Sequence, residues 1–315
     1  MSRNFFINFD KAGAEWVVVA YLSGDANMIS VVESGESPHV VTAHLATGIP
    51  KDLIIAEHKL LGEMNDPAKI EALRQQHLPE LFSYDWIPRQ FALRQTFKKA
   101  NHGLNYKEDW FRFMMDNEME ASEAKRICHS YRGSIKGEPY SGPVAYPNIT
   151  VWWNSIEEEL RSNRRTLGNL LGHKREFPGM WGDDLIKSAI SYKPQSTIGA
   201  MVRRGQRLSY RAMESGIPSF DLADLMANVH DSLLFTYPWG KWFSAARFAM
   251  RVDSFMSPIL ECKGRTFKIK TDLKVGGKNW SRMVEVKPQK DVASLANAIK
   301  DAVKLSEQSD AKKAT

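Results

Sequence analysis

The chain has 315 residues, of which 43% are hydrophobic and 25% are charged, which is typical of a soluble globular protein with a substantial core. No apolar run reaches about 18 residues, which excludes a membrane span, and no secretory signal pattern is present. The two cysteines, Cys128 and Cys262, are too few for a disulfide framework or a cysteine zinc site, so the cytosol is the expected compartment. The formal charge of +6 and the sequence pI of about 9.1 fit a nucleic-acid partner, although many soluble proteins share such values.

The amino-terminal part of the chain begins with an apolar segment, residues 5–9, that predicts a buried strand. Asp10 ends this strand, a position that suits a functional carboxylate or, alternatively, a helix cap. The next apolar segment, residues 14–22, fits either a buried helix or a second strand, because its periodicity does not separate the two.

Residues 50–90 are mostly charged and helix-forming, and the segment that follows them is amphipathic. One face of the helix predicted over residues 91–106 is apolar, with Leu93, Phe97, Ala100 and Leu104. Another face is polar and largely basic, with Arg94, Lys98, Asn101, His102 and Asn105. An arginine and a lysine one turn apart can clamp the phosphates of a nucleotide, and the alternative is an ordinary solvated face.

A β-hairpin is predicted further along the chain, after a Gly- and Pro-rich loop over residues 132–148 and a helix over residues 151–163. Apolar residues alternate over 225–229 and again over 233–237, which is the period of strands. Three polar residues, from His230 to Ser232, separate the two runs and form the predicted turn. Asp231 at its tip suits a hard divalent cation, and the alternative is an ordinary turn aspartate.

The carboxyl-terminal segment beyond Pro288 predicts an amphipathic helix, because Val292, Leu295, Ile299 and Val303 recur on one helical face. Such a face either packs on the chain's own sheet or docks a separate chain.

Several segments resemble, in the same order, the polymerase motifs of the family A DNA polymerases. Residues 10–25, DKAGAEWVVVAYLSGD, are similar to the first of these motifs. The resemblance makes Asp10 a metal-binding aspartate and Glu15 a steric gate against the ribose 2′-hydroxyl. The chain departs from the family's Tyr-Ser-Gln at Lys11, Ala12 and Gly13.

Two further segments resemble nucleotide-binding motifs of this family. Residues 37–43, SPHVVTA, are similar to D-I-H-x-x-T-A, which makes His39 a ligand of the nucleotide phosphates. Residues 94–106 are similar to R-x3-K-x3-F-G-x2-Y-G, the nucleotide-binding helix of the fingers. The resemblance makes Arg94 and Lys98 triphosphate ligands, and it places His102 and Tyr106 beside the sugar and base. His102 stands where the family has another aromatic residue, and Lys107 replaces the final glycine.

The resemblance also assigns residues that contact DNA. Residues 165–175 are similar to E-T-L-x-G-R-R-R, and residues 189–196 to A-I-N-x-P-x-Q-G, in which the glutamine reads the minor groove. Residues 228–231 match Q-V-H-D, and residues 274–280 resemble the family's G-x-N-W. Ser232 stands where DNA-polymerising members usually have Glu, and His-Asp-Ser also occurs in single-subunit RNA polymerases. The expected DNA contacts are Arg165, Lys174, Arg175, Gln195 and His230. For the first three, a merely cationic turn is the alternative.

The resemblance covers about residues 5–282 and implies an α/β (α+β) right-hand polymerase core, with an antiparallel palm sheet and helical fingers. It assigns residues 1–49 and 181–288 to the palm, 50–180 to the fingers and 289–315 to an amphipathic or disordered tail. It implies template-directed transfer of dNMP from dNTPs to a primer, with two Mg²⁺ ions held by Asp10 and Asp231 and with primer–template DNA as partner. The expected compartment becomes the cytoplasm of a bacterial cell or of a virus-infected host cell.

Three alternatives remain open at this point. Because the first motif lies at the amino terminus, the chain is expected to be a split or truncated catalytic subunit, with a separate chain supplying thumb and exonuclease functions. A catalytically weak, polymerase-like DNA-binding subunit is the second possibility. A single-subunit-type RNA polymerase or primase is the third.

Overall fold

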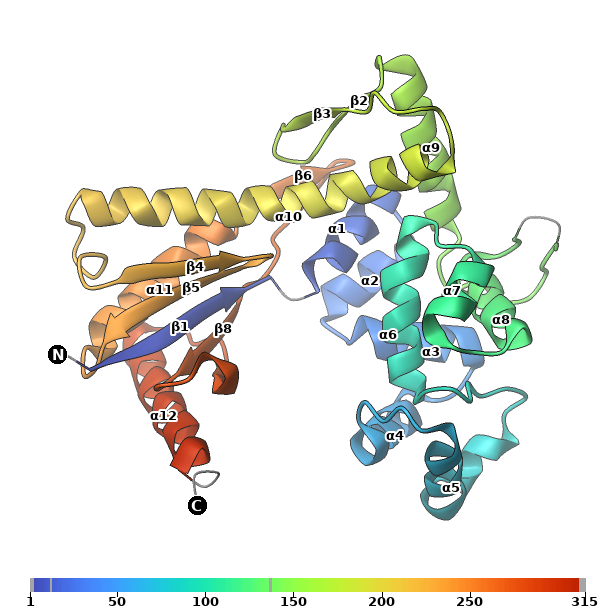
Figure 1. Cartoon of the computed structure of the whole chain (residues 1–315), viewed down its shortest axis with the longest axis horizontal. Coiled ribbons are helices and arrows are strands. Elements are labelled where there is room, and N and C mark those ends of the chain that lie inside the picture. The colour runs from blue at the N-terminus through green and yellow to red at the C-terminus, as the bar shows by residue number, and fades with distance from the viewer. Residues whose placement is uncertain (1–2, 12, 136–137, 312–315) are drawn as a thin grey trace. The chain divides into compact units, whose positions relative to one another are not determined.

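The computed structural model describes residues 3–11, 13–135 and 138–311, and it combines one five-stranded antiparallel sheet with many helices (Figure 1). The chain forms two compact units. The first contains residues Met1–Glu15, Asn169–His173 and Gln195–Thr315, and the second contains Trp16–Gly168 and Lys174–Pro194. This confirms the predicted mixed α/β class with an antiparallel sheet. No helix in the described part of the chain has the length and apolar character needed to cross a membrane.

The sheet of the first unit has the strand order β4-β5-β1-β8-β9, and all of its strand pairs are antiparallel. Its strands are β1 (Asn4–Asp10), β4 (Asp224–Val229), β5 (Ser232–Pro238), β8 (Asp272–Gly276) and β9 (Val284–Val286). A separate two-stranded ribbon contains β6 (Leu260–Cys262) and β7 (Arg265–Phe267), and η3 (Trp280–Arg282) is a short 3₁₀ helix.

Alternation along β1 determines which face of this sheet is apolar. Phe5, Ile7 and Phe9 are fully buried on one face. Helix α11 (Trp242–Met256) covers that face, where Phe248 contacts Phe9 with their ring centroids 6.1 Å apart. Asp10 falls in the other phase of the alternation, so it lies on the opposite, more polar face.

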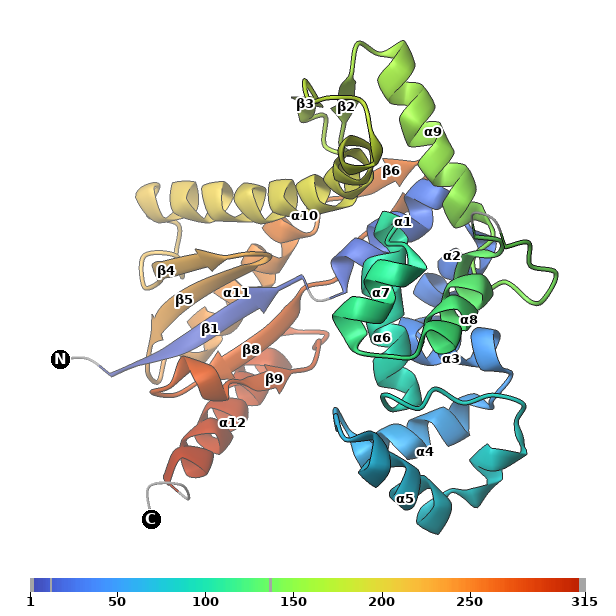
Figure 2. The same ribbon diagram turned by 45° about the vertical axis from the view of Figure 1, so that its right-hand side comes forward.

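Two long helices contribute to the first unit, one of them only from Gln195 on. Gly205 lets helix α10 (Asp183–Glu214) approach α11 closely, since a Cβ atom there would collide with the side chain of Met256. Helix α12 (Val292–Ala311) packs on α11, β8 and β9 (Figure 2). Its residues Leu295, Ile299 and Val303 are buried in these contacts. The described part of the amphipathic tail is therefore a helix whose predicted apolar face packs on its own sheet.

The second unit is helical. Its helices are α1 (Ala14–Ser23), α2 (Ala26–Ser34), α3 (Pro38–Thr47), α4 (Lys51–Leu61), α5 (Pro67–His77), α6 (Leu93–Gly103), α7 (Trp110–Asn117), α8 (Ala121–Arg132) and α9 (Asn148–Ser162). It also contains the 3₁₀ helices η1 (Pro79–Ser83) and η2 (Leu104–Tyr106) and the ribbon of β2 (Thr166–Gly168) and β3 (Lys174–Glu176). The segment 14–22, for which helix and strand remained open, is thus the helix α1.

The limits of the two units differ from the expected domain limits. Residues 16–49 group with the helical unit, although they were assigned to the palm. The tip of the β2–β3 ribbon, Asn169–His173, and helix α12 group with the sheet. In this tip the backbone N–H of Leu170 donates to the hydroxyl of Thr197, a residue of the same unit, at 3.3 Å.

Candidate functional site

Asp10 and the turn residue Asp231 lie at one end of the sheet, beside the neighbouring strands β1 and β5. Asp10 is the last residue of β1, and its direct partner on β5 is Ser232. Asp231 occupies the turn immediately before Ser232. The backbone N–H of Lys11 donates to the carbonyl oxygen of Asp231 at 3.2 Å, which joins the end of β1 to the turn. Strand pairing therefore brings together two carboxylate residues that are far apart in the sequence.

The turn that carries Asp231 is tighter than the sequence predicts. Ser232 already belongs to β5, so the turn between the strands consists of His230 and Asp231 alone. His230 is exposed and has a φ of +54°, in the left-handed region that few non-glycine residues occupy. The hydroxyl of Ser232 donates to the carbonyl oxygen of Val229 at 3.0 Å, which closes the turn.

A second group of charged residues faces Asp10 from its other neighbour, β8. Asp272 is the direct partner of Asp10 across β1 and β8. Lys274 donates from Nζ to Oδ2 of Asp10 at 3.2 Å, and Glu285 on β9 is the direct partner of Lys274. Burial, and next the negative charges of Glu285 and Asp10, raise the pKa of Asp272. The end of the sheet is therefore strongly acidic, and Lys274 offsets part of this charge.

The donor set at this end fits magnesium that a substrate also ligates. Among residues 3–11, 13–135 and 138–311, no group of three or more His, Cys, Asp or Glu side chains could hold a metal ion by itself. Magnesium commonly takes one or two protein carboxylates and completes its shell with substrate phosphates and water. Asp10, at the end of β1, and Asp231, in the adjacent β4–β5 turn, offer hard oxygen donors, so these residues fit that mode of binding.

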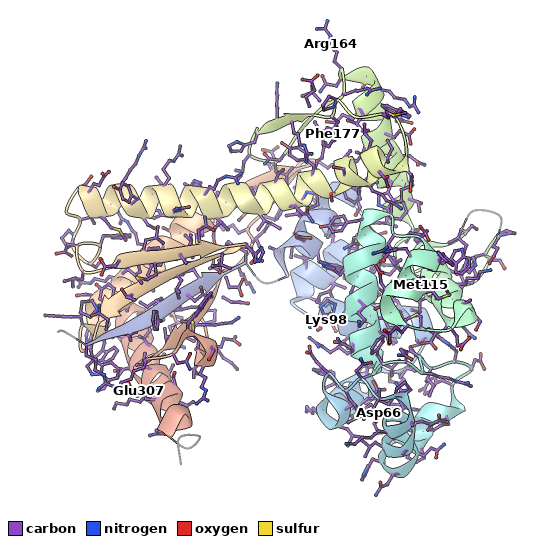
Figure 3. All side chains as sticks on the ribbon, viewed as in Figure 1. Asp66, Lys98, Met115, Arg164, Phe177 and Glu307 are labelled. Carbon is purple, nitrogen blue, oxygen red and sulfur yellow. The ribbon has the colours of Figure 1, made fainter. Side chains whose placement is uncertain are left out.

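The nucleotide-binding candidates of the second unit lie on α6. Leu93, Phe97 and Ala100 are fully buried and anchor the helix, as its apolar periodicity predicts. Lys98, which Figure 3 labels on α6, is exposed. It pairs with the exposed Glu63 at 2.8 Å. Arg94, one turn before it, is partly buried and has no hydrogen-bond or ion-pair partner among the described residues. Arg94 and Lys98 thus place two cations one helical turn apart. Arg94 has no partner among the described residues and the partner of Lys98 is exposed to solvent, so both cations are available to an anion.

The polar face of α6 is less exposed than the sequence predicts. Asn101 and Asn105 are buried, with 3% and 2% of their surface exposed. Asn105 accepts from the phenol of Tyr131 at 2.7 Å, which satisfies its amide oxygen. The prediction that both asparagines share an exposed basic face is wrong, because partners from other helices satisfy them in the interior.

Asn101 contacts His39 of α3. The amide nitrogen of Asn101 lies 3.0 Å from Nδ1 of His39, and its amide oxygen lies 3.1 Å from the Thr42 hydroxyl, which also lies 2.6 Å from the carbonyl oxygen of Pro38. With the amide in this orientation its nitrogen donates to Nδ1, so the neutral ring carries its proton on Nε2. Burial, with the nearby positive charges of Arg94 and Lys98, lowers the pKa of His39 to about 4. His39 is therefore neutral near pH 7 and offers an N–H donor.

A buried ion pair fixes the amino terminus of α6. Oε2 of Glu57 accepts a hydrogen bond from the backbone N–H of Leu93 at 2.7 Å, and Oε1 accepts from Nε of Arg74 at 2.7 Å. Arg74 also donates to the carbonyl oxygens of Pro88 and Phe91, at 2.7 and 3.1 Å. Both side chains are almost completely buried. The network sets the position of the helix one residue before Arg94.

The remaining nucleotide-site candidates are His102, Tyr106 and Glu15. His102 is exposed, and Tyr106 is partly buried in η2. Lys107, which replaces the family's glycine, has a φ of +63° and pairs with Asp183 at 3.0 Å. A residue with a left-handed backbone conformation is thus still required at this position, and here a lysine adopts that conformation. Glu15 lies in the first turn of α1 and is partly buried.

The predicted DNA contacts divide into two kinds. Lys174 and Gln195 are exposed, on β3 and α10. Arg165 instead donates to the carbonyl oxygen of Gly179 at 2.6 Å, and Arg175 lies over Phe177 with 4.8 Å between its guanidinium carbon and the ring centroid. In Figure 3, Arg164 projects outward from this region. Arg165 and Arg175 therefore brace the ribbon, and only their remaining donors are available to a ligand.

Sequence reasoning missed the residues that surround these candidates. Asp272, Lys274 and Glu57 approach the candidate residues from other strands and helices. The charged residues at 272 and 274, two apart in the sequence, are the one local signal that could have drawn attention to the first two.

Comparisons with known proteins agree with this architecture. No protein-family model matches the chain. Over 264 residues, 80% of this chain, it is 23% identical to a thermostable DNA polymerase I from Thermus aquaticus. The match covers 25% of that protein, so the chain spans about a quarter of the length of this curated relative.

A solved structure has the same fold. The POL domain of Pol1 from M. smegmatis, in complex with DNA primer-template and dNTP, matches with a TM-score of 0.61 and 16% identity, over 89% of this chain and 40% of that one. The resemblance to the polymerase region of a family A DNA polymerase is thereby confirmed, and the fold is that of a DNA polymerase POL domain.

Proposed function

We propose that this chain is a catalytic core for template-directed DNA synthesis, transferring dNMP from a dNTP to the 3′-hydroxyl of a primer. The observation that carries the proposal is the pairing of β1 with the β4–β5 hairpin, which places Asp10 and Asp231 at adjacent strand ends. The same fold holds primer-template and dNTP in the Pol1 domain. Primer extension with purified protein, a primed template, dNTPs and Mg²⁺ tests the proposal.

The carboxylates have the role of holding the divalent metal. Asp10 and Asp231 would hold two Mg²⁺ ions, and the phosphates of a bound dNTP would supply further oxygen ligands. When bound, the ions supply Lewis acidity, which lowers the pKa of the primer hydroxyl and stabilises the leaving pyrophosphate. Lys274 must release Asp10, or share it, before the carboxylate can serve a metal, because its ammonium lies 3.2 Å from Oδ2.

The basic face of α6 has the role of binding the triphosphate. Arg94 offers a planar fork without a partner among the described residues, and Lys98 exchanges the solvated Glu63 for a phosphate. His39 donates from Nε2 as a neutral ring, which adds a directed hydrogen bond without the cost of burying another charge. His102 and Tyr106 contact the sugar and base, and Glu15 excludes the 2′-hydroxyl.

The chain contacts the DNA duplex mostly through the sugar–phosphate backbone. Lys174 and His230 are exposed and contact phosphates or sugars, as do the outer donors of Arg165 and Arg175. Gln195, exposed on α10, donates to minor-groove acceptors that all base pairs share. Such contacts predict binding that weakens steeply as salt is raised.

One observation favours a second candidate function, RNA synthesis. Ser232 is the direct partner of Asp10, where DNA-polymerising members of the resembled family carry Glu, so β5 brings no further carboxylate to Asp10. Extension with NTPs in place of dNTPs decides between the two. If the primer is extended with neither dNTPs nor NTPs although the chain binds primed DNA, the chain is the polymerase-like binding subunit.

A separate chain that supplies thumb and exonuclease functions remains part of the proposal. The buried residues Leu295, Ile299 and Val303 of helix α12 are not available to dock it, because they pack within the chain's own first unit. Activity that rises sharply on addition of such a chain, and that is distributive and salt-sensitive without it, is the expected result.

A further inference from the structure

Lys11 is a fully buried lysine directly after Asp10, and neither the sequence motifs nor the proposed reaction assigns it a role. None of its surface is exposed, and it is among the largest completely buried side chains of the chain. A buried ammonium is costly unless all of its donors are satisfied.

The ammonium of Lys11 uses all of its donors. Nζ donates to the hydroxyl of Ser257 at 2.8 Å, to the carbonyl oxygen of Ile269 at 2.8 Å and to the hydroxyl of Thr271 at 2.7 Å. The Ser257 hydroxyl in turn donates to Oδ1 of Asp253 at 3.0 Å. Three hydrogen bonds with good distances fix the position of a side chain that would otherwise have many rotamers.

The partners of Lys11 connect the segments that carry the carboxylates. Its backbone N–H donates to the carbonyl oxygen of Asp231 at 3.2 Å, which holds the turn between β4 and β5. Thr271 immediately precedes Asp272, the direct partner of Asp10 on β8. One residue therefore ties the end of β1 to the turn on one side and to the start of β8 on the other.

A purely structural strut would not need a charge at this position. A well-packed apolar side chain of similar volume usually stabilises an interior as well as, or better than, a buried cation. The buried ammonium instead fixes a single geometry, because its three N–H donors require three acceptors in one arrangement. It also places positive charge behind a strongly acidic strand end, where Asp10, Asp272 and Glu285 meet.

We propose that Lys11 is a positioning residue, which holds Asp10 and Asp231 in the spacing that a divalent metal and the dNTP phosphates require. The inference rests on the proposed function, since it concerns the same two carboxylates. It predicts that loss of the ammonium loosens the metal site more than it loosens the fold.

The test compares metal binding, kinetics and stability in Lys11→Met, which keeps the length and volume of the side chain but removes its donors. Mn²⁺ alone, titrated into the purified full chain and followed by electron paramagnetic resonance, is expected to bind about tenfold more weakly than to the parent. Primer extension is expected to lose kcat while the KM for dNTP stays nearly unchanged. Tyr237→Phe is the matched control, because it removes a 2.9 Å hydrogen bond to the Ser219 carbonyl oxygen at the other end of β5.

The control is expected to lower the melting temperature and leave Mn²⁺ binding unchanged. If Lys11→Met does not fold, the double variant Ser257→Ala/Thr271→Val replaces it, since it removes two of the three acceptors and retains the lysine. Parent-like Mn²⁺ affinity in whichever variant folds would overturn the inference. Asp10→Asn and Asp231→Asn separate this outcome from failure of the proposed function: if they also bind Mn²⁺ like the parent, the carboxylates themselves are not the metal site.

Discussion

The backbone N–H of Lys11 donates a hydrogen bond to the carbonyl oxygen of Asp231 across 3.2 Å. The bond links the first residue after β1 to the tip of the β4–β5 hairpin, so the two carboxylate-bearing residues have a fixed relation through the main chain. Because that relation does not depend on the carboxyl groups, either aspartate can be changed without removing the contact.

Asp10→Asn and Asp231→Asn are therefore expected to abolish primer extension while DNA binding and folding remain largely intact. A neutral amide cannot replace a charged ligand of a hard cation. Extension rates, gel-shift affinity and melting temperature measure the three properties. Extension within about tenfold of the parent in either variant would contradict the two-metal assignment.

Lys98→Ala is expected to raise the KM for dNTP and to lower kcat, with a loss on the order of 100-fold in kcat/KM, because a charge that stabilises the transition state is removed. Its ion pair with Glu63 is exposed on both sides, so the fold loses little. Lys99→Ala is the matched control, since Lys99 lies about 100° further round the helix and its Nζ sits over the Phe91 ring at 4.4 Å. Similar kinetic losses in both variants would mean that α6 is only a solvated basic face.

Glu15→Ala is expected to admit ribonucleotides, because it opens space in the first turn of α1 where the steric gate is proposed. The measurement is the ratio of kcat/KM for dNTP and NTP in parent and variant. A parent that already uses both substrates equally would refute the gate and favour RNA synthesis.

Arg74→Met is expected to lower the free energy of unfolding by about 3–5 kcal/mol, because it leaves the carboxylate of Glu57 buried without its cation. Burial already raises the pKa of Glu57, against the opposing effect of Arg74. Urea denaturation measures the change. The double variant Glu57→Gln/Arg74→Met is expected to lose less than the single variant, and a larger loss would show that the pair is not an isolated ionic unit.

His39 is expected to make stability depend on pH between about 6.5 and 4. Its pKa of about 4 in the folded chain lies below the ordinary value of 6.5, so the unfolded chain binds more protons in this window. The stability contributed by neutral His39 is thus complete above pH 6.5 and is lost as the pH falls toward 4. Urea denaturation across this range should show a weaker pH dependence in His39→Asn than in the parent. Equal dependence in both proteins would place the pKa of His39 near its ordinary value.

Local pattern was sufficient to predict much of this protein. The period of two over residues 225–229 and 233–237 identified the hairpin, and the helical period over 93–104 identified the buried side of α6. Both follow from backbone geometry, since side chains alternate along a strand and recur every third or fourth residue on a helix. The order of the motifs added the family resemblance and, with it, the expected roles of Asp10 and Asp231.

Tertiary structure alone decided which residues became neighbours. The strand order β5-β1-β8 puts Asp272 and Lys274 beside Asp10, and no local pattern encodes the order of strands in a sheet. The sequence pattern predicts that Asn101 is an exposed polar residue, yet it is buried beside His39 and Thr42, which contact its amide. The burial of a polar group depends on partners from other elements, and those partners are set by long-range packing. The same holds for Lys11, whose buried position became evident only when the three acceptors around its ammonium were in place.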